Sequence, residues 1–385
     1  MRRLARAVGL AGALALAACA GAQTSNAELP RLDRPSQVLF WSQAEREAGF
    51  RAMDRIAPHR VVRAGGEVRP LPNGVPLDID VSAYMAAEKV AGMLVIQDGR
   101  IRLERYGLGL GPNDRWTSFS VAKSVTSTLV GAALADGSIE SLETPIVRYL
   151  PELSGSAYDG VTVRQLLTMT SGVAWNEDYD DPNSDVARFF EPRESGGMDP
   201  TLAYMRALPH AADPGTRWHY STGETSLVGV LISRVTGQTL ADYLSSTLWR
   251  PYGMEQDAAW MIDEAGQEPG GCCLVASLRD WGRFGQFILN GGRIGDRPVL
   301  PADYLAQATS KQADTGSPDS GYGFQWTTFN DGTFGGRGIF GQAIQIDPER
   351  RLVVVILSAW PVATDRRHTA ARADVLSRIS AAADR

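Results

Sequence analysis

The stretch AGMLVIQDGRIRLERY, residues Ala91–Tyr106, decides the fold. Seven uncharged residues lead into Asp98-Gly99, a dipeptide typical of a tight turn, and apolar and charged side chains alternate after it. This pattern predicts a β-hairpin with a buried first strand and a half-exposed second strand. Two further apolar segments, Gln342–Asp347 and Arg351–Ser358, are joined by Pro348-Glu349-Arg350 and predict a second strand pair.

Helical patterns fill the region between these β-rich ends. We expect helices at Val121–Ala135, Thr162–Met169, Gly223–Thr236, Leu240–Trp249 and Leu278–Leu289, and one after the last strand at Ala371–Ala383. The fold class is therefore α/β, an α+β sandwich whose antiparallel sheet is formed by both ends of the chain and flanked by helices. A helical lobe, about residues 119–310, is inserted, and active sites often lie between such lobes.

Composition excludes some functions. The chain of 385 residues carries a net charge of −6, so we expect no nucleic-acid partner. The four histidines are scattered without the spacing of metal ligands, and no phosphate-binding glycine loop precedes a helix; we expect neither metal nor cofactor. A disulfide between adjacent cysteines is strained, so we expect Cys272 and Cys273 to be buried or free thiols.

The N-terminus reads as a targeting segment. Basic residues precede a short apolar run in residues 1–18, which predicts a signal peptide too short to span a bilayer. The ending Leu16-Ala17-Ala18-Cys19 resembles the lipobox of bacterial lipoproteins, which implies cleavage before Cys19 and its lipidation. An ordinary secretory signal is the alternative. We expect residues 19–35 to be a flexible tether, residues 36–385 to be the folded domain, and the protein to be an exported, membrane-anchored lipoprotein facing the periplasm.

The motif Ser120-Val121-Ala122-Lys123 opens the apolar helix at Val121–Ala135. Residues at i and i+3 share a helix face, so the amine of Lys123 can reach the hydroxyl of Ser120. Serine needs a base to become a nucleophile, and a desolvated lysine can serve. The chain has only three lysines, and the alternative, a solvated Lys123, fits poorly in so apolar a helix. A Ser-His-Asp triad with His219 has no local support, since no serine lies in a G-x-S-x-G motif.

Three further stretches carry a resemblance: Pro214–Thr222 (PGTRWHYST), Val163–Gly172 (VRQLLTMTSG) and Leu278–Gly285 (LRDWGRFG). With the Ser-x-x-Lys motif, they resemble the serine β-lactamase and penicillin-binding superfamily, in particular its class C-like branch. The opening Val38–Phe50 resembles the 6-aminohexanoate-dimer (nylon-oligomer) hydrolase subgroup. The resemblance spans about residue 36 to the C-terminus.

The resemblance implies three catalytic roles. Ser120 is the acylated nucleophile and Lys123 its general base. Tyr220 passes the proton to the leaving group and activates the deacylating water. Tyr220 can share the proton only if nearby cations, here Lys123, lower its pKa from the ordinary value of about 10. A merely packed aromatic is the alternative for Tyr220.

Departures from the family pattern narrow the range of expected substrates. The K-T-G motif is absent from the sequence, and its lysine helps to hold the substrate carboxylate in β-lactam-processing relatives. Its loss argues for an ester or amide substrate. In relatives the K-T-G motif lies on a strand beside the nucleophile. The corresponding strand of this chain is still expected to supply an oxyanion-hole N–H opposite that of Ser120, from Ile339 or, as the alternative, from Gly336.

Substrate contacts are expected at three positions. Thr222 stands where relatives with Y-x-N carry an amide, and Phe340 lies beside the expected oxyanion donor. Tyr179 lies in an acidic loop, where the nylon-oligomer hydrolases have a tyrosine that closes over the bound amide. A loop that simply stays solvated is the alternative.

The sequence thus favours a serine hydrolase that cleaves a small-molecule ester or amide through an acyl-enzyme on Ser120, tethered to a membrane by an N-terminal lipid. Two alternatives stay open. One is a β-lactamase or D-Ala-D-Ala peptidase acting on cell-wall substrates. The other is a non-catalytic lipoprotein that binds a ligand.

Overall fold

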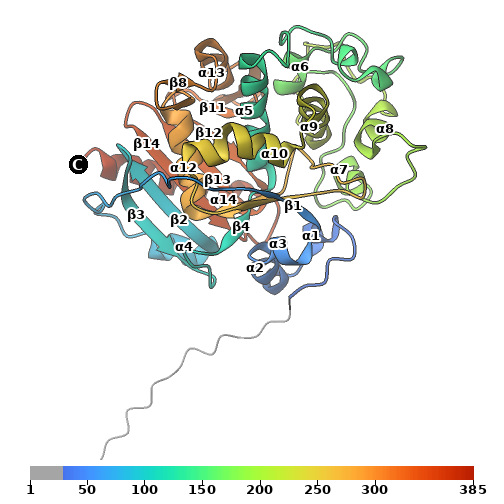
Figure 1. The fold of residues 1–385 in the computed structure, drawn as a ribbon. Coiled ribbons are helices and arrows are strands. Elements are labelled where there is room, and N and C mark those ends of the chain that lie inside the picture. The colour runs from blue at the N-terminus through green and yellow to red at the C-terminus, as the bar shows by residue number, and fades with distance from the viewer. Residues whose placement is uncertain (1–28) are drawn as a thin grey trace, which may run out of the picture.

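The computed structural model describes residues 29–385 (Figure 1). The expected signal peptide and Cys19 lie outside the described residues. The last residues of the segment expected as a tether lie on the domain: Pro30 is buried, and Leu32 packs against the main core. Apolar side chains therefore hold the chain on the domain before residue 36.

One antiparallel sheet joins the two ends of the chain, as expected. Its eight strands follow the order β3-β2-β14-β13-β12-β11-β10-β9. Their bounds are β2 Val90–Gln97, β3 Arg100–Tyr106, β9 Ala313–Asp314, β10 Ser320–Tyr322, β11 Thr327–Phe329, β12 Phe334–Arg337, β13 Ala343–Asp347 and β14 Leu352–Ser358. The pair β2–β14 is central, with Val95 opposite Val354. The hairpins predicted at either end of the sequence are therefore confirmed.

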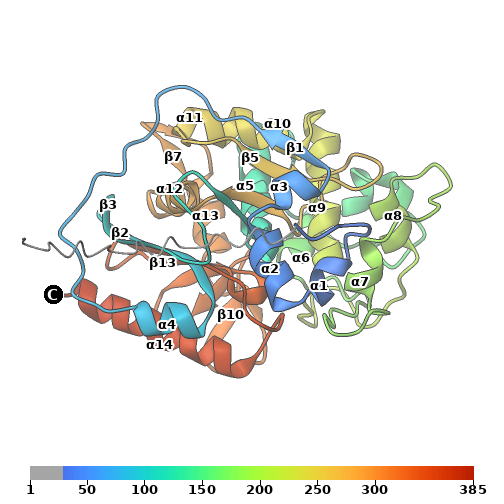
Figure 2. The ribbon, with the colours of Figure 1, turned by 90° about the horizontal axis from the view of Figure 1, so that it is seen from below.

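Helices cover both faces of this sheet, which explains why β14 is buried throughout and β2 is buried at every residue but its last (Figure 2). On one face, Gly282 of α12 (Leu278–Leu289) lets the helix approach Leu94 and Ile96 closely. On the other face, Met93 and Val95 pack with α14 (Arg366–Ala383) and α4 (Ser82–Ala87). Helix α14 begins five residues before the expected start, because the Asp365 side chain accepts hydrogen bonds from its first turn.

The helical lobe is built around two buried helices, α5 and α9, which pack on one another (Figure 1). The helices of this region are α5 Ala122–Ala135, α6 Val163–Leu167, α7 Asp185–Phe189, α8 Pro200–Arg206, α9 Thr222–Thr236, α10 Leu240–Leu244, α11 Arg250–Tyr252 and α13 Ala302–Ala308. The expected helix at residues 240–249 is α10 followed by one wider helical turn, Ser245–Trp249.

A second, four-stranded sheet was not expected from the sequence. Its order is β1-β5-β6-β4, with bounds β1 His59–Val62, β5 Ala258–Met261, β6 Leu274–Ser277 and β4 Arg115–Thr117. Strands of three or four residues are too short to show a period. The remaining elements are short. They are the helices α1 Gln37–Phe40, α2 Gln43–Phe50 and α3 Met53–Ile56, single 3-10 turns such as Ile146–Arg148 and Pro151–Leu153, and the small hairpin of β7 Arg293–Ile294 and β8 Arg297–Pro298. Within residues 29–385, the structure contains no helix with the length and apolar character that a membrane crossing requires.

Candidate active site

Ser120 lies in a tight turn between β4 and α5. The turn is a single 3-10 turn, Phe119–Val121, that runs directly into the helix. Phe119 adopts a positive φ of 44°, which a bulky residue holds only when its surroundings fix it. Its ring packs between Phe50 and Phe340, with ring centroids 4.9 and 5.3 Å away. This aromatic packing sets the position of Ser120 at the start of the buried helix.

Lys123 lies one turn further on and is fully buried. Its Nζ donates to Ser120 Oγ at 3.0 Å, Thr222 Oγ1 at 2.9 Å and the carbonyl of Gly271 at 2.7 Å. Burial lowers the pKa of Lys123 to about 8, against the opposing effect of the Glu177 carboxylate. A substantial fraction of this amine is therefore neutral near pH 8.

The three acceptors around Lys123 are not equivalent. The Gly271 carbonyl can only accept, and the Thr222 hydroxyl gives its own proton to the Glu177 carboxylate, so it too accepts from the lysine. A neutral amine has two N–H bonds and one lone pair. Those two N–H bonds satisfy Gly271 and Thr222, which directs the lone pair at the hydroxyl of Ser120. Close approach requires the glycine, since a Cβ there would lie 2.6 Å from the Thr222 carbonyl oxygen.

Tyr220 lies beside this pair, with Lys123 Nζ 4.9 Å from its ring centroid. Burial raises the pKa of Tyr220 well above its ordinary value; Glu177 adds to the rise, and a hydrogen bond with Ser120 opposes it. The expectation of a lowered tyrosine pKa is therefore wrong. The lysine lies over the ring, and desolvation dominates, so Tyr220 is present as a neutral phenol that can donate and accept a proton in the same step.

The sequence interpretation missed Glu177, whose carboxylate organises the other side of the site. It accepts from the backbone N–H of Thr222 at 3.0 Å, from the Tyr179 hydroxyl at 2.6 Å and from the indole N–H of Trp175. A carboxylate is favourable here because Thr222 begins α9. Tyr179 lies at the site, and Thr222 is hydrogen-bonded to Lys123 and Glu177. The acidic loop around Tyr179 was the only available clue to Glu177.

The strand residues near Ser120 divide into two groups. Ile339 lines the space around the nucleophile. Gly336 is paired with Ile344 inside the sheet and faces Ser124 of α5, so it is not at the site. Phe340 is fully buried against Phe119 and lines neither cavity described below, which corrects its expected contact with substrate. Its φ of 58° turns the ring inward, toward the aromatic cluster.

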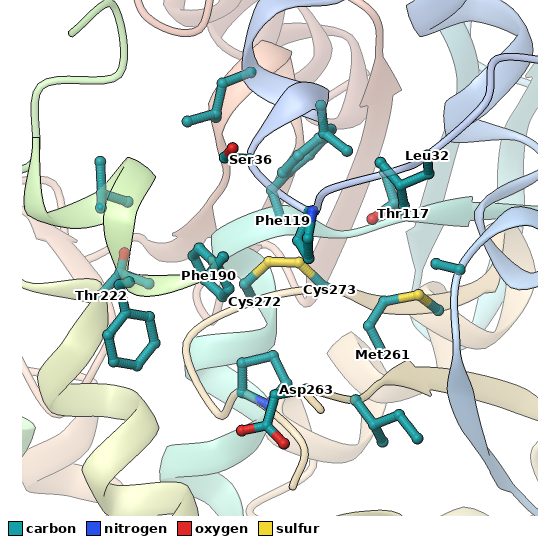
Figure 3. A pocket seen from close by; sticks show the side chains of 18 of the residues that line it. Leu32, Ser36, Thr117, Phe119, Phe190, Thr222, Met261, Asp263, Cys272 and Cys273 are labelled. Carbon is teal, nitrogen blue, oxygen red and sulfur yellow. A yellow bond between two sulfur atoms is a disulfide. The ribbon is translucent and has the colours of Figure 1, made fainter. Parts of the chain in front are cut away.

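Two cavities meet at Ser120, and Tyr179 and Ile339 also line both. The apolar cavity, about 130 Å³, is lined mainly by hydrophobic side chains, among them Leu32, Val38, Phe119, Val186, Phe189, Phe190 and Met261 (Figure 3). The polar cavity, about 240 Å³, is lined by charged and hydrogen-bonding groups, among them Lys123, Glu177, Tyr220, Gln325, Arg337 and Arg372. The nucleophile therefore stands at a boundary between two chemically different spaces.

A disulfide joins Cys272 and Cys273 in the wall of the apolar cavity (Figure 3). This corrects the expectation of buried or free thiols. Adjacent side chains of an extended strand point to opposite sides. Cys273 has a positive φ of 73°, and this departure from extended geometry brings the two sulfur atoms together.

The fold and the serine–lysine–tyrosine cluster define a serine hydrolase with a β-lactamase-type architecture. Comparison with known families agrees: the Beta-lactamase family model matches residues 77–377, so the chain belongs to the beta-lactamase family. The resemblance seen in the sequence motifs is thereby confirmed, and this protein is a serine hydrolase of that family.

Individual relatives give the same result. The chain is 29% identical to 6-aminohexanoate-dimer hydrolase from Paenarthrobacter ureafaciens over 368 residues, which cover 89% of this chain and 93% of the relative. It is 30% identical to esterase EstB from Burkholderia gladioli, over 35% of this chain and 36% of the esterase. Among solved structures, a Bacillus anthracis protein assigned to the 6-aminohexanoate-dimer hydrolases superposes with a TM-score of 0.76 at 22% identity, covering 87% of this chain and 95% of that one.

Proposed function

We propose that this protein hydrolyses small esters or amides through an acyl-enzyme on Ser120, without a cofactor, as an amidase or carboxylesterase similar to the 6-aminohexanoate-dimer hydrolase it resembles. The observation that carries the proposal is the contact of 3.0 Å between Lys123 Nζ and Ser120 Oγ, made by a buried amine whose pKa is lowered to about 8. A buried lysine that meets a serine hydroxyl has the geometry and the proton affinity of a general base.

In the acylation step, Ser120 Oγ attacks the carbonyl carbon of the substrate and its proton passes to the neutral amine of Lys123. The carbonyl oxygen becomes an oxyanion held by the backbone N–H groups of Ser120 and Ile339. Both residues lie at the start of a 3-10 turn, where backbone N–H groups have no partner within the turn. The neutral phenol of Tyr220 relays a proton from Lys123 to the leaving alcohol or amine as the carbon–oxygen or carbon–nitrogen bond breaks.

Deacylation reverses the proton path. A water molecule gives its proton through Tyr220 to Lys123 and attacks the acyl carbonyl, and Ser120 leaves with a proton from Lys123. Glu177 and Thr222 hold the lysine in the orientation that keeps its lone pair on the serine. The absent K-T-G motif disfavours the rival β-lactam activity.

The test is covalent labelling read by intact-mass spectrometry of the domain from residue 29 onward. The wild-type protein is expected to gain one fluorophosphonate adduct and to hydrolyse p-nitrophenyl acetate. Ser120→Ala is expected to lose both, whereas Ser127→Ala, a buried serine on the same helix that bonds Tyr304, keeps both. An adduct that persists in Ser120→Ala would refute the assignment of the nucleophile.

Export as a lipoprotein is a separate proposal, supported by the lipobox-like ending at Cys19. In a bacterial host, the full chain is expected to incorporate labelled palmitate and to fractionate with the membranes, with its folded domain on the periplasmic side. Cys19→Ala is expected to lose the label. A labelled Cys19→Ala chain, or an unlabelled wild type, would argue for an ordinary secretory signal.

A further inference from the structure

The disulfide between Cys272 and Cys273 has no role in the mechanism described above, yet the residue before it holds the base. The carbonyl of Gly271 accepts a hydrogen bond from Lys123 Nζ at 2.7 Å. This bond takes one of the N–H groups of the neutral amine and so helps to direct its lone pair at the serine. A small displacement of the Gly271 carbonyl would therefore misalign the base.

The residue after the disulfide holds the turn that carries the nucleophile. The N–H of Leu274 donates to the Ser118 hydroxyl at 3.1 Å, and the Leu274 carbonyl accepts from the backbone N–H of Ser118 at 2.9 Å. Ser118 is buried and lies two residues before Ser120. The two cysteines thus lie in sequence between the anchor of the base and the anchor of the nucleophile.

The disulfide fixes the backbone between these two anchors. A bond between the sulfur atoms of adjacent residues closes an eight-membered ring around one peptide bond. Cys273 has a φ of 73° in this ring, a conformation that residues other than glycine rarely adopt. Once the ring is opened, Cys273 is free to return to negative φ, which rotates the chain between Gly271 and Leu274. We therefore expect the Gly271 carbonyl to move when the disulfide is reduced.

A small molecule can reach the disulfide from the substrate side. Both cysteines line the apolar cavity beside Ser120 (Figure 3). Cys272 is buried, whereas Cys273 is partly exposed. Thiol–disulfide exchange begins with attack of a thiolate on an accessible sulfur atom. The sulfur of Cys273 is therefore the expected point of attack.

We propose that the Cys272–Cys273 pair is a redox-active modification site that regulates the hydrolase: the disulfide holds Lys123 and Ser120 in their reactive arrangement, and reduction by a dithiol lowers the reactivity of Ser120. A thiolate of the dithiol attacks the sulfur of Cys273, the disulfide bond breaks, and Cys272 leaves as a thiolate. The second thiolate of the dithiol then closes the reductant's own disulfide and releases Cys273. Two electrons and the two protons of the dithiol pass to the cysteines. The effect on activity rests on the proposed function.

The modification is tested in the Cys19→Ala chain, which keeps Cys272 and Cys273 as its only cysteines. The folded chain is treated with dithiothreitol, freed of it, and then alkylated with iodoacetamide in urea. Mass spectrometry is expected to show no alkyl group without the treatment and two after it, on the peptide that contains both cysteines. Two groups without dithiothreitol, or none after it, would overturn the proposal.

The effect on the site is read from the rate at which a fluorophosphonate labels Ser120. Reduction is expected to slow labelling about tenfold or more, because the base is misaligned, and oxidised dithiothreitol is expected to restore the rate. The variant Cys272→Ala/Cys273→Ala should label slowly, with or without dithiothreitol. Cys272→Ala/Cys273→Gly should label faster than this alanine variant, since glycine adopts a positive φ freely, and it should not respond to dithiothreitol either.

The outcomes separate this inference from the proposed function. Absence of any label in both redox states would remove the hydrolase and its regulation together. Equal labelling rates before and after a reduction verified by alkylation would overturn the regulation alone. The regulation would also fall if the alanine variant labelled as fast as the oxidised chain, or if the glycine variant were no faster than the alanine variant.

Discussion

The two cavities that meet at Ser120 differ in the polarity of the side chains that line them. The apolar cavity has walls of packed hydrophobic side chains, which stabilise the fold as they shape the space. The polar cavity contains Lys123 and Arg372, whose pKa values are lowered because burial disfavours their charged forms. Buried ionisable groups of this kind lower the free energy of unfolding. The difference indicates that the catalytic groups lie on the polar side of Ser120 and that the apolar side can accept an apolar part of a substrate.

The largest expected effect comes from Lys123→Met, which removes the base that serves substrates of both cavities. We expect kcat/KM for p-nitrophenyl acetate and p-nitrophenyl hexanoate to fall by the same factor, about 10³-fold or more, in steady-state assays. Lys311→Met is the control, since Lys311 is an exposed partner of Asp314. A loss confined to one of the two esters would contradict a single shared base.

The pH dependence sharpens this assignment. Because the base form of Lys123 is the neutral amine and its pKa is lowered to about 8, activity must rise as the proton is lost. We expect kcat/KM for p-nitrophenyl acetate to rise about tenfold from pH 7 to pH 9 and then to level off. A rate that falls across that interval, or does not change, would exclude Lys123 as the base.

A smaller effect is expected in the apolar cavity. Phe190 lines it, with its ring perpendicular to that of Phe189. Phe190→Ala removes apolar contact from long chains, so we expect the kcat/KM ratio of p-nitrophenyl hexanoate to p-nitrophenyl acetate to fall about three- to tenfold. Phe40→Ala serves as the control, since Phe40 is exposed and lies outside both cavities. An unchanged ratio in Phe190→Ala, or an equal fall in Phe40→Ala, would contradict the assignment of the apolar cavity to the acyl chain.

Stability gives the mildest test of the comparison. Lys123 has a pKa of about 8 in the folded chain, against an ordinary value of 10.5. Between pH 8 and pH 10.5 the unfolded chain therefore binds more protons at this lysine than the folded chain does. The contribution of Lys123 to the free energy of unfolding rises with pH across that window. At pH 7, Lys123→Met is expected to raise the free energy of unfolding by about 1–3 kcal/mol, and Phe190→Ala to lower it by a similar amount. Urea unfolding at pH 7 and pH 9 measures both. A less stable Lys123→Met at pH 7 would refute the cost assigned to the buried amine.

Local patterns predicted the elements that carry strong periodicity or an unbroken apolar run. The hairpin β2–β3 and the strand β14 could be read because they are long, and α5 because it is apolar from end to end. The pairing of Ser120 with Lys123 followed from helical spacing alone. The position of Tyr220 beside them came from the family resemblance, since nothing local brings α9 to α5.

The remaining features depend on contacts between distant segments. Glu177 acts through Thr222, 45 residues away, and no pattern in the acidic loop indicates that partner. Phe340 and Ile339 are neighbours in sequence, yet a positive φ sends the Phe340 ring into the core. Arg372 reads as one more charged residue of an exposed helix until the structure places it over Trp360. The positions of these side chains depend on which distant segments bury them, and that burial cannot be read from the local sequence.

The most direct test of the central claim is to identify the acylated residue. Tyr220→Phe slows deacylation by removing the proton relay, so mixing this variant with p-nitrophenyl hexanoate, quenching in acid and mapping peptides should trap the intermediate. We expect one hexanoyl group, on the peptide that contains Ser120, with release of one equivalent of p-nitrophenol before slow turnover. A hexanoyl group on another residue, or p-nitrophenol release at full turnover without any acylated peptide, would contradict the acyl-enzyme on Ser120.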